Sequence, residues 1–453
     1  MAARLRNPSA PLALLAIVSV LSLAVRLAWL DEPCRSPCTT AADHTLVFDE
    51  SYYVNAARVI AGLKPPPGSS YAGSPAGVDP NSEHPQLAKL VIAGSIELFG
   101  DGPFAWRIGS ILLGSLAILG MFALVRAAGG GRWPALAASA LMAADNLMIV
   151  HGRIGTLDVY VLAAMLWAVV LYLRGRPLAG GVVLGIGACA KLVAPDAVFV
   201  VAVIELLRVM LARTAADGSW RSQLGGASKR LGVFAAAGAA VFLVLLDVMD
   251  RIAPPYNPNT HKLVSGGPLG HVGHMLSYQA NLTSPHGPTG IASYPWEWLV
   301  DYKPITYLYI NPARPTRGLY NIHPAVHFLG MVSPPIMLLA LPGLAVAAWR
   351  LLRGGRPTRI DDVPSRPDPS AASAELAILA LAWFAGTFLP FELLSVIDSR
   401  TSYLYYMVIV MPGIYAAIVH LFARWRPQRW VLISWGALVL VAAILMYPFT
   451  PLP

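Results

Sequence analysis

The segment FDESYYVNAARVIAG, residues 48–62, places two adjacent carboxylates soon after the first long apolar stretch of a mostly hydrophobic chain. Asp49 and Glu50 are costly to remove from water, and they do nothing to help a chain insert into a bilayer. A polar pair just beyond an apolar stretch is typical of a site that meets a substrate held in the membrane. The pair therefore indicates an active site at the edge of a membrane domain.

The composition predicts what kind of domain surrounds this pair. The 453 residues are 56% hydrophobic and only 13% charged, whereas a soluble domain carries about 25% charged residues. We therefore expect an all-α polytopic membrane protein, because apolar stretches of about 20 residues cross a bilayer as helices. About eleven such spans are expected: 11–30, 106–126, 134–150, 156–173, 178–191, 193–211, 231–248, 327–349, 375–396, 402–423 and 430–447. The apolar segment 86–100 fits a helix at the membrane interface better.

Positive charges alternate between the loops. The formal net charge is +9, and a cytoplasmic N-terminus places arginine or lysine in every cytoplasmic loop. These residues are Arg4, Arg6, Arg126, Arg132, Arg174, Arg176, Arg213, Arg221, Lys229, Arg230, Arg350, Arg353, Arg356, Arg359, Arg366, Arg424, Arg426 and Arg429. Basic cytoplasmic loops set membrane orientation, so this pattern indicates topology rather than nucleic-acid binding. We expect a multi-pass protein of the cell (plasma) membrane, with a cytoplasmic N-terminus and an active site that faces outside.

Two external segments are too long to be simple connections. Residues 31–105 form a first external loop with juxtamembrane helices at 49–62 and 86–99, and residues 249–326 form a large external loop rich in histidine, proline and aromatic residues. No repeat and no appended soluble domain is evident. We therefore expect residues 1–453 to form a single transmembrane domain.

The three cysteines carry little information. Cys34 and Cys38 lie in the first external loop, where a disulfide is permitted although the short spacing would strain it. The sequence leaves open whether this disulfide forms. Cys189 lies in a predicted span and is expected to pack there, and we expect no metal site from two lone cysteines.

Ionisable residues gather at the outer ends of the spans. They occur in DNLMIVHGRIGTLD (145–158), at Lys191, and in IDSRTSYLYY (397–406). Such groups are rare at membrane depth and usually mark substrate paths. A transporter would bury them near the bilayer midplane, so their position favours catalysis at the outer surface.

The acidic pair fits a glycosyl transfer with inversion, which needs one base to take the proton of an acceptor hydroxyl. Successive residues of a helix point about 100° apart, so Asp49 and Glu50 need not share one task. We assign Asp49 as the catalytic base and Glu50 to binding of the acceptor or the sugar. Alternatively, Asp49 only caps the helix 50–62, and the sequence leaves both interpretations open.

Arg153 and Arg400 are candidates for binding a donor phosphate. A guanidinium at an external turn has no role in topology, and it binds phosphate through two N–H groups. Each arginine could instead pair with a nearby carboxylate, such as Asp158 or Asp398. Asp158 is itself a candidate for contact with the sugar or the acceptor.

The motif SEHPQLAKL, residues 82–90, adds two candidates. Lys89 is a plausible partner for the carrier phosphate, and snorkelling from an interfacial helix is the alternative. His84 is a candidate for contact with the sugar or the acceptor. The two residues lie about 140° apart around a helix, so a shared contact is not guaranteed.

Aromatic residues and a histidine distinguish the segment HMLSYQANLTSPHGPTGIASYPWEWLVDYKP (274–304). Tyr278 and Trp296 could stack on a sugar or on the acceptor. The alternative is a place in the aromatic belt of the membrane interface, which suits Trp296 and Trp298 well. His286 lies between proline and glycine and is interpreted as a positioned polar group.

Five segments together resemble the protein O-mannosyltransferase family, membrane enzymes of the GT-C fold. The resemblance covers most of the chain, and no single motif carries it alone. FDESYYVNAARVIAG is similar to the family's Asp-Glu motif, and EHPQLAK resembles its His-Pro-Pro-Leu-Ala-Lys motif. FAWRIGSILLG, DNLMIVHGRIGTLD and the segment 276–304 resemble the family's second span, its Asp-Asn…Leu-Asp turn and its large loop.

The resemblance implies a polyprenyl-phosphate-linked mannose donor, transfer to Ser or Thr hydroxyls of exported proteins, and inversion at the sugar carbon. By motif position it gives Asp49 the catalytic role, and it directs Arg153, Lys89 and His286 toward the carrier phosphate. The donor already carries a phosphate leaving group, so positive side chains could stabilise its charge without a metal or a cofactor. The implied partners are this donor, the acceptor and membrane lipids, with no nucleic acid.

The chain departs from the family pattern at several positions. Gln86 stands in place of a proline, Gly152 stands where the family often has serine, and Gly287 to Thr289 replace part of the large-loop motif. These departures bear on the sugar and the acceptor more than on the fold. One alternative therefore keeps the donor class but uses a lipid or cell-wall glycan acceptor, as in the similar aminoarabinose transferases. Another is a lipid-carrier transporter without enzymatic activity.

Overall fold

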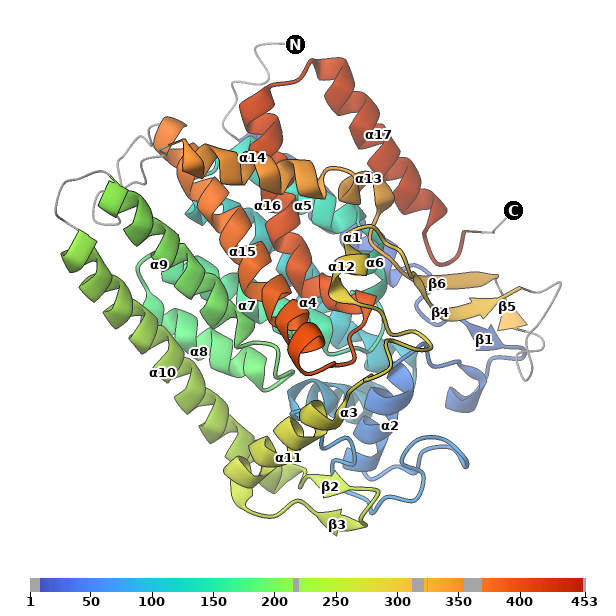
Figure 1. The fold of residues 1–453 in the computed structure, drawn as a ribbon. Helices are drawn as coiled ribbons and strands as arrows, with labels where there is room; N and C mark the ends of the chain where they lie inside the picture. The colour runs from blue at the N-terminus through green and yellow to red at the C-terminus, as the bar shows by residue number, and fades with distance from the viewer. Residues whose placement is uncertain (1–8, 215–219, 312–321, 324, 354–368, 451–453) are drawn as a thin grey trace.

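The computed structural model describes residues 9–214, 220–311, 322–323, 325–353 and 369–450. Long helices form a bundle, and the short helices and strands gather toward the bottom and right of Figure 1. Most of these short elements come from the two segments that the sequence assigns to external loops. Parts of the two segments therefore lie together, and their place on the external side stays a prediction.

Helices dominate the described chain, which confirms the predicted fold class. The α-helices are α1 (Ala10–Leu27), α2 (Glu50–Ile60), α3 (Leu87–Phe99), α4 (Pro103–Ala127), α5 (Arg132–Ala144), α6 (Asn146–His151), α7 (Asp158–Leu173), α8 (Pro177–Ala188), α9 (Asp196–Thr214), α10 (Trp220–Ile252), α11 (Gly267–Asn281), α12 (Pro295–Trp298), α13 (Pro334–Met337), α14 (Ala340–Leu352), α15 (Pro369–Ile397), α16 (Met407–Trp425) and α17 (Arg429–Leu445). Two 3-10 helices, Ala41–Asp43 and Leu404–Tyr406, also occur. Helices α2 and α3 stand where the sequence predicts them.

Six helices of the described residues are long and apolar enough to cross a membrane. They are Ala10–Leu27, Pro103–Ala127, Trp220–Ile252, Pro334–Leu352, Ala374–Ile397 and Leu404–Trp425. Shorter apolar helices are Asp158–Leu173, Pro177–Ala188 and Arg429–Leu445. The chain is thus a multi-pass membrane protein. The number of crossing helices, about eleven on the expected length of a span, stays a prediction.

Short strands pair in three two-stranded antiparallel sheets among the described residues. The pairs are β1 (Cys34–Arg35) with β5 (Ile322–His323), β2 (Tyr256–Asn257) with β3 (Lys262–Leu263), and β4 (Ile305–Ile310) with β6 (Val326–Gly330). The predicted span 327–349 is wrong at its start, because β6 occupies its first residues. The side chains of β6 alternate between buried and half-buried, as a strand requires. The helical part begins only at Pro334, which suits the first turn of a helix.

The predicted span 134–150 is also divided. Helix α5 ends at Ala144, and Asp145 begins α6 as its N-cap by accepting a hydrogen bond from the Leu147 N–H at 3.1 Å. Tyr415 of α16 donates its hydroxyl to the same carboxylate at 2.6 Å. A buried carboxylate with these partners anchors the break to the central helix of the bundle.

Helix α8 approaches α10 closely because glycines line the contact. A Cβ atom at Gly185 would lie 2.6 Å from the Gly238 carbonyl oxygen and 2.8 Å from Cβ of Val241. Small residues allow such backbone contact between membrane helices. The packing fixes the turn that follows α8, and this turn carries Lys191.

The structure joins Cys34 and Cys38 in a disulfide, with Cα atoms 5.6 Å apart. Cys34 also pairs with His323 in the β1–β5 sheet, so the first loop is attached to the large loop. Cys189 is buried, as expected for a packing residue.

Candidate active site

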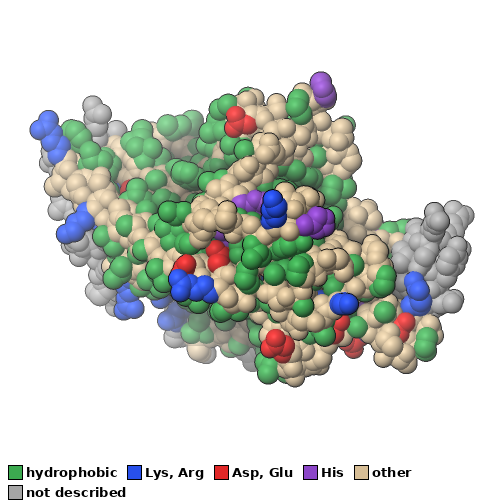
Figure 2. Space-filling model, turned by 90° about the horizontal axis from the view of Figure 1, so that it is seen from below, with side chains coloured by type: hydrophobic (Ala, Val, Ile, Leu, Met, Phe, Trp, Pro, Cys, Tyr) green, Lys and Arg blue, Asp and Glu red, His purple; other side chains and the backbone are tan. Residues whose placement is uncertain are grey.

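A cavity of about 640 Å³ lies where the ends of α7, α9, α11 and α15 meet. Its polar lining is His84, Asp158, Lys191, Asp196, Gln279, Thr283, Asp398, Arg400 and Tyr406, and its apolar lining is Leu192, Val193, Leu276, Ala280, Pro390, Phe391, Leu394 and Ile409. The view from below, toward α2, α3 and α11, shows a few charged and histidine side chains among mostly hydrophobic and neutral ones (Figure 2). The cavity thus brings together three residues predicted from the sequence, His84, Asp158 and Arg400.

A buried ion pair forms the polar wall of this cavity. Lys191 Nζ lies 2.6 Å from Asp158 Oδ1, and both residues are at least nine-tenths buried. The same ammonium lies 5.4 Å from the ring centres of Tyr405 and Tyr406. Asp158 also lies 3.7 Å from His151 Nδ1. The cavity therefore holds a cation in a position where a phosphate could approach it.

Asp49 occupies the N-cap position of α2, but its side chain makes no capping hydrogen bond. No other hydrogen bond to this carboxylate occurs among the described residues. Burial raises the pKa of Asp49 to about 7, the Lys191 cation lowers it, and the charge of Asp158 raises it further. Helix capping, the alternative interpretation, therefore does not describe this side chain. The geometry leaves a half-buried carboxylate with a pKa suited to proton transfer near neutral pH.

Glu50 has a different environment from Asp49. It is fully buried, and Arg107 donates to its two oxygens at 2.9 and 3.0 Å. The N–H groups of Val47 and Gly155 donate to the same carboxylate at 2.8 and 2.7 Å. Both oxygens are occupied, so this arrangement does not support the predicted direct contact of Glu50 with sugar or acceptor. Glu50 instead joins the start of α2 to α4 and to the turn before α7, which holds Asp49 in place.

Lys89 is also turned inward. Its ammonium lies 2.5 Å from Asp79 Oδ2 and donates to the carbonyl oxygens of Asn81 and His84 at 2.5 and 2.8 Å. The side chain is fully buried and lies outside the cavity lining. This geometry supports neither phosphate contact nor snorkelling, because the Lys89 ammonium donates to groups within the loop that carries His84.

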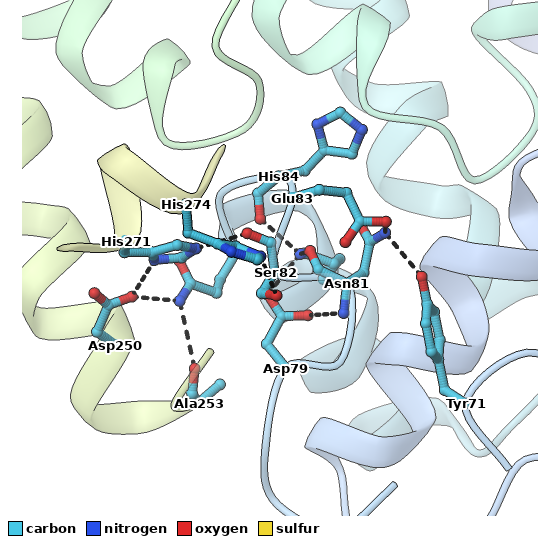
Figure 3. Close-up of polar contacts among 12 residues, drawn as sticks. Tyr71, Asp79, Asn81, Ser82, Glu83, His84, Asp250, Ala253, His271 and His274 are labelled. Carbon is cyan, nitrogen blue, oxygen red and sulfur yellow. Dashed lines mark hydrogen bonds and ion pairs between the residues drawn. The ribbon is translucent and has the colours of Figure 1, made fainter. Parts of the chain in front are cut away.

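A network of polar contacts holds this loop against α10 and α11 (Figure 3). His271 lies between Asp250, at 2.7 Å from Nδ1, and the Ser82 carbonyl oxygen, at 3.0 Å from Nε2. Gln86, the departure from the family's proline, donates to Asp250 at 2.6 Å. The His84 imidazole points away from these contacts. Burial, together with the neighbouring cations, holds the pKa of His84 well below its usual value, so a neutral imidazole faces the cavity.

Sequence comparison shows that parts of this chain are similar to known proteins. Residues 83–237 match the family model described as dolichyl-phosphate-mannose-protein mannosyltransferase. The polyprenol-phosphate-mannose–protein mannosyltransferase of Corynebacterium glutamicum is 31% identical over 160 residues, which are 34% of this chain and 29% of that protein. Its counterpart in Mycolicibacterium smegmatis is 24% identical over 389 residues, which are 75% of this chain and 71% of that protein.

Solved structures show the same fold. The Saccharomyces cerevisiae protein O-mannosyltransferase Pmt1-Pmt2 complex bound to the sugar donor has a TM-score of 0.67 and 14% identity, over 96% of this chain and 89% of that chain. The chain is thus similar to the protein O-mannosyltransferase family, over residues 83–237 for the family model and over most of its length for the fold. An oligosaccharyltransferase from Archaeoglobus fulgidus, in complex with Zn and sulfate, has a TM-score of 0.51 and 13% identity, over 97% of this chain and 53% of that chain.

Arg153 lies away from the cavity lining. Its guanidinium donates to the Tyr447 hydroxyl at 2.9 Å and to the Ala28 carbonyl oxygen at 2.8 Å. The Phe449 ring centre lies 4.6 Å from its central carbon. Because its donors and its face are occupied, this geometry does not support contact with a carrier phosphate. Arg153 instead ties the end of α1 to the chain beyond α17.

Arg400 is the predicted arginine that the structure does place at the cavity. It donates to the carbonyl and the side-chain oxygen of Gln279 at 2.9 and 2.5 Å. It also lines a smaller neighbouring cavity of about 260 Å³, which Trp296 lines as well. Trp296 stacks on Tyr294 with ring centres 4.2 Å apart and is 45% exposed. Its other face is therefore open to a ligand.

The two remaining predicted site residues, Tyr278 and His286, are exposed. Tyr278 lies on α11 and is 42% exposed. His286 is exposed in the segment that follows α11, and neither residue lines the large cavity. The structure leaves their roles in binding as predictions.

Two buried charged residues of the cavity, Lys191 and Asp196, were not selected as site residues from the sequence. Lys191 was visible only as a cation at an outer turn, and a search for positive residues at span ends would have included it. Asp196 gave no signal, because a carboxylate at the start of a helix is usually a solvated capping group.

Proposed function

We propose that this chain is an inverting glycosyltransferase that transfers mannose from a polyprenyl-phosphate carrier to Ser or Thr hydroxyls of exported proteins. The observation that carries the proposal is the carboxylate of Asp49, which lacks a hydrogen-bond partner among the described residues and is electrostatically coupled to Lys191 and Asp158 of the cavity. The names of the relatives, which include a mannosyl carrier and a protein acceptor, support the choice of donor and acceptor.

The cavity fits the two parts of such a donor. Lys191 and Arg400 supply positive charge for the phosphate. Pro390, Phe391 and Leu394 of α15 supply an apolar wall for the prenyl chain. A sugar phosphate bound there would leave its sugar near the carboxylates of the cavity.

The proposed chemistry needs one base and one stabilised leaving group. Asp49 accepts the proton of the acceptor hydroxyl while the hydroxyl oxygen forms a bond to the anomeric carbon. The bond from this carbon to the phosphate oxygen breaks, and its electron pair stays on the polyprenyl phosphate. Lys191 and Arg400 stabilise the negative charge on that oxygen. Attack from the face opposite the phosphate inverts the anomeric carbon.

We also propose that the site faces the outside of the plasma membrane. The cavity is lined by His84 of the first long loop and by Leu276, Gln279, Ala280 and Thr283 of the second. The arginines that the sequence assigns to cytoplasmic loops lie outside both segments. A site there would meet exported proteins and a carrier with its sugar on the outer leaflet.

The test is incubation of the purified protein with radiolabelled polyprenyl-phosphate mannose and a Ser/Thr-rich peptide. We expect label in the peptide, and a matched peptide with Ala at every Ser and Thr should remain unlabelled. Label only in a lipid or glycan fraction would assign a different acceptor. Carrier movement across a vesicle membrane without sugar transfer would contradict the enzymatic proposal.

A further inference from the structure

Asp196 is a buried carboxyl group of the cavity with an unpaired oxygen. It is the first residue of α9, lines the same cavity as Lys191 and Arg400, and is only 8% exposed. Among the described residues, no protein group donates a hydrogen bond to its buried Oδ2. Buried carboxyl oxygens in native proteins are normally hydrogen-bonded, and leaving one unpaired is costly.

The described side chains around Asp196 do not supply the hydrogen bond that its buried oxygen lacks. Asp158 of the same cavity has its partner in Lys191, at 2.6 Å, whereas Val193 and Phe391 line the cavity beside Asp196 with apolar surface. The N-terminus of α9 provides a favourable dipole for a negative charge. It does not provide a hydrogen-bond donor to the buried Oδ2. The missing partner must come from the cavity.

We propose that Asp196 binds a hydroxyl group of the sugar on the donor, an inference that rests on the proposed function. A carboxyl group exchanges hydrogen bonds with hydroxyls, whereas a phosphate is attracted most strongly to cations. The phosphate therefore goes to Lys191 and Arg400, and the sugar goes to Asp196. A site built to bind a hydroxyl rejects a ligand that lacks it, so Asp196 selects the sugar.

The test measures equilibrium binding to the full-length protein in lipid nanodiscs. The probes are polyprenyl-phosphate mannose, its monodeoxy analogues, and polyprenyl phosphate without sugar. Asp196→Ala should weaken binding of the mannose donor by about 10- to 100-fold, the usual range for a hydrogen bond to a charged group. Binding of the sugar-free carrier should stay unchanged. For the wild type, one monodeoxy donor should bind more weakly than the mannose donor by a similar factor. For Asp196→Ala, this deoxy donor and the mannose donor should bind with the same affinity.

Glu392→Gln is the matched control, because Glu392 Oε2 also lacks a partner while Glu392 lies outside the cavity lining. This variant should bind every donor like the wild type. Equal affinities of wild type and Asp196→Ala for all donors would overturn the inference. Equally weak binding of the sugar-free carrier by Asp196→Ala would also overturn it, because Asp196 would then affect only the charge of the cavity. A lower melting temperature with unchanged affinity would overturn it too, because Asp196 would then only stabilise α9.

The binding experiment separates this inference from the proposed function. If the wild type binds the mannose donor through Asp196 but transfers no sugar to any peptide, the proposed transfer fails and the binding inference stands. If the peptide is labelled but the deoxy donors bind equally well, the transfer stands and the inference about Asp196 fails.

Discussion

Replacing Glu50 by glutamine tests whether this residue positions Asp49 or touches the substrate. The change keeps the shape of the side chain but removes the charge that Arg107 pairs with at 2.9 Å, and Arg107 is only 2% exposed. Removing one partner of a buried ion pair destabilises a protein by about 3–5 kcal/mol. We expect a loss toward the lower end of that range, because Arg107 still donates to the carbonyl oxygens of Leu30 and Glu32 at 2.5 and 2.9 Å.

Two measurements separate positioning from contact. Unfolding in a detergent titration should show the loss of stability, and steady-state kinetics should show a lower kcat with an unchanged KM for the donor. Asp101→Asn is the control, because Asp101 pairs with Arg58 at 2.9 Å in the same loop region. That variant should lose stability but keep its kcat per folded molecule. Normal stability of Glu50→Gln with a raised donor KM would refute the positioning role and restore direct contact with the sugar.

Two further predictions concern the pH dependence of transfer and the role of Arg153. The rate of transfer should rise with pH through about 7, because Asp49 must lose its proton to act as a base and burial raises its pKa to about 7. Asp158→Asn should move this limb to lower pH and Lys191→Met to higher pH, whereas a rate that is flat through this range would contradict the assignment of the base. Arg153→Ala should lower the free energy of unfolding by about 1–3 kcal/mol, since it leaves the Tyr447 hydroxyl and two carbonyl groups without their donor. Its donor KM should not change, and a large increase would show that Arg153 binds the carrier after all.

Local patterns were sufficient for much of the fold. The apolar stretches and the arginine-rich loops predict the helical bundle and the grouping of the external segments, because length, hydrophobicity and flanking charge act locally. The strand β6 was missed because Val326–Gly330 is as apolar as the helix that follows it. Its pairing with β4, 16 to 25 residues away in the register, decides its structure. Composition alone does not predict that this segment pairs with β4.

The site was predictable in part for a similar reason. Asp49, His84 and Asp158 stand in motifs whose position along the chain predicts an outer surface. The structure places His84 and Asp158 at the cavity, whereas Asp49 lies outside its lining and only its pKa responds to Lys191 and Asp158. Lys89 and Arg153 stand in similar motifs but turn toward partners within the fold. A sequence shows that a cation is present, but it does not show which acceptor groups the cation contacts in the folded protein. That choice depends on contacts between distant segments.

The most direct test of the central claim is the activity of Asp49→Asn with radiolabelled polyprenyl-phosphate mannose. The variant should fold and bind the donor like the wild type, because the Asp49 side chain makes no hydrogen bond that supports the fold. Its transfer to a Ser/Thr-rich peptide should fall by at least about 10²-fold, the usual contribution of a general base. Asp31→Asn, at an exposed position in the same loop, should transfer normally. Transfer by Asp49→Asn at a rate near that of the wild type would contradict the account.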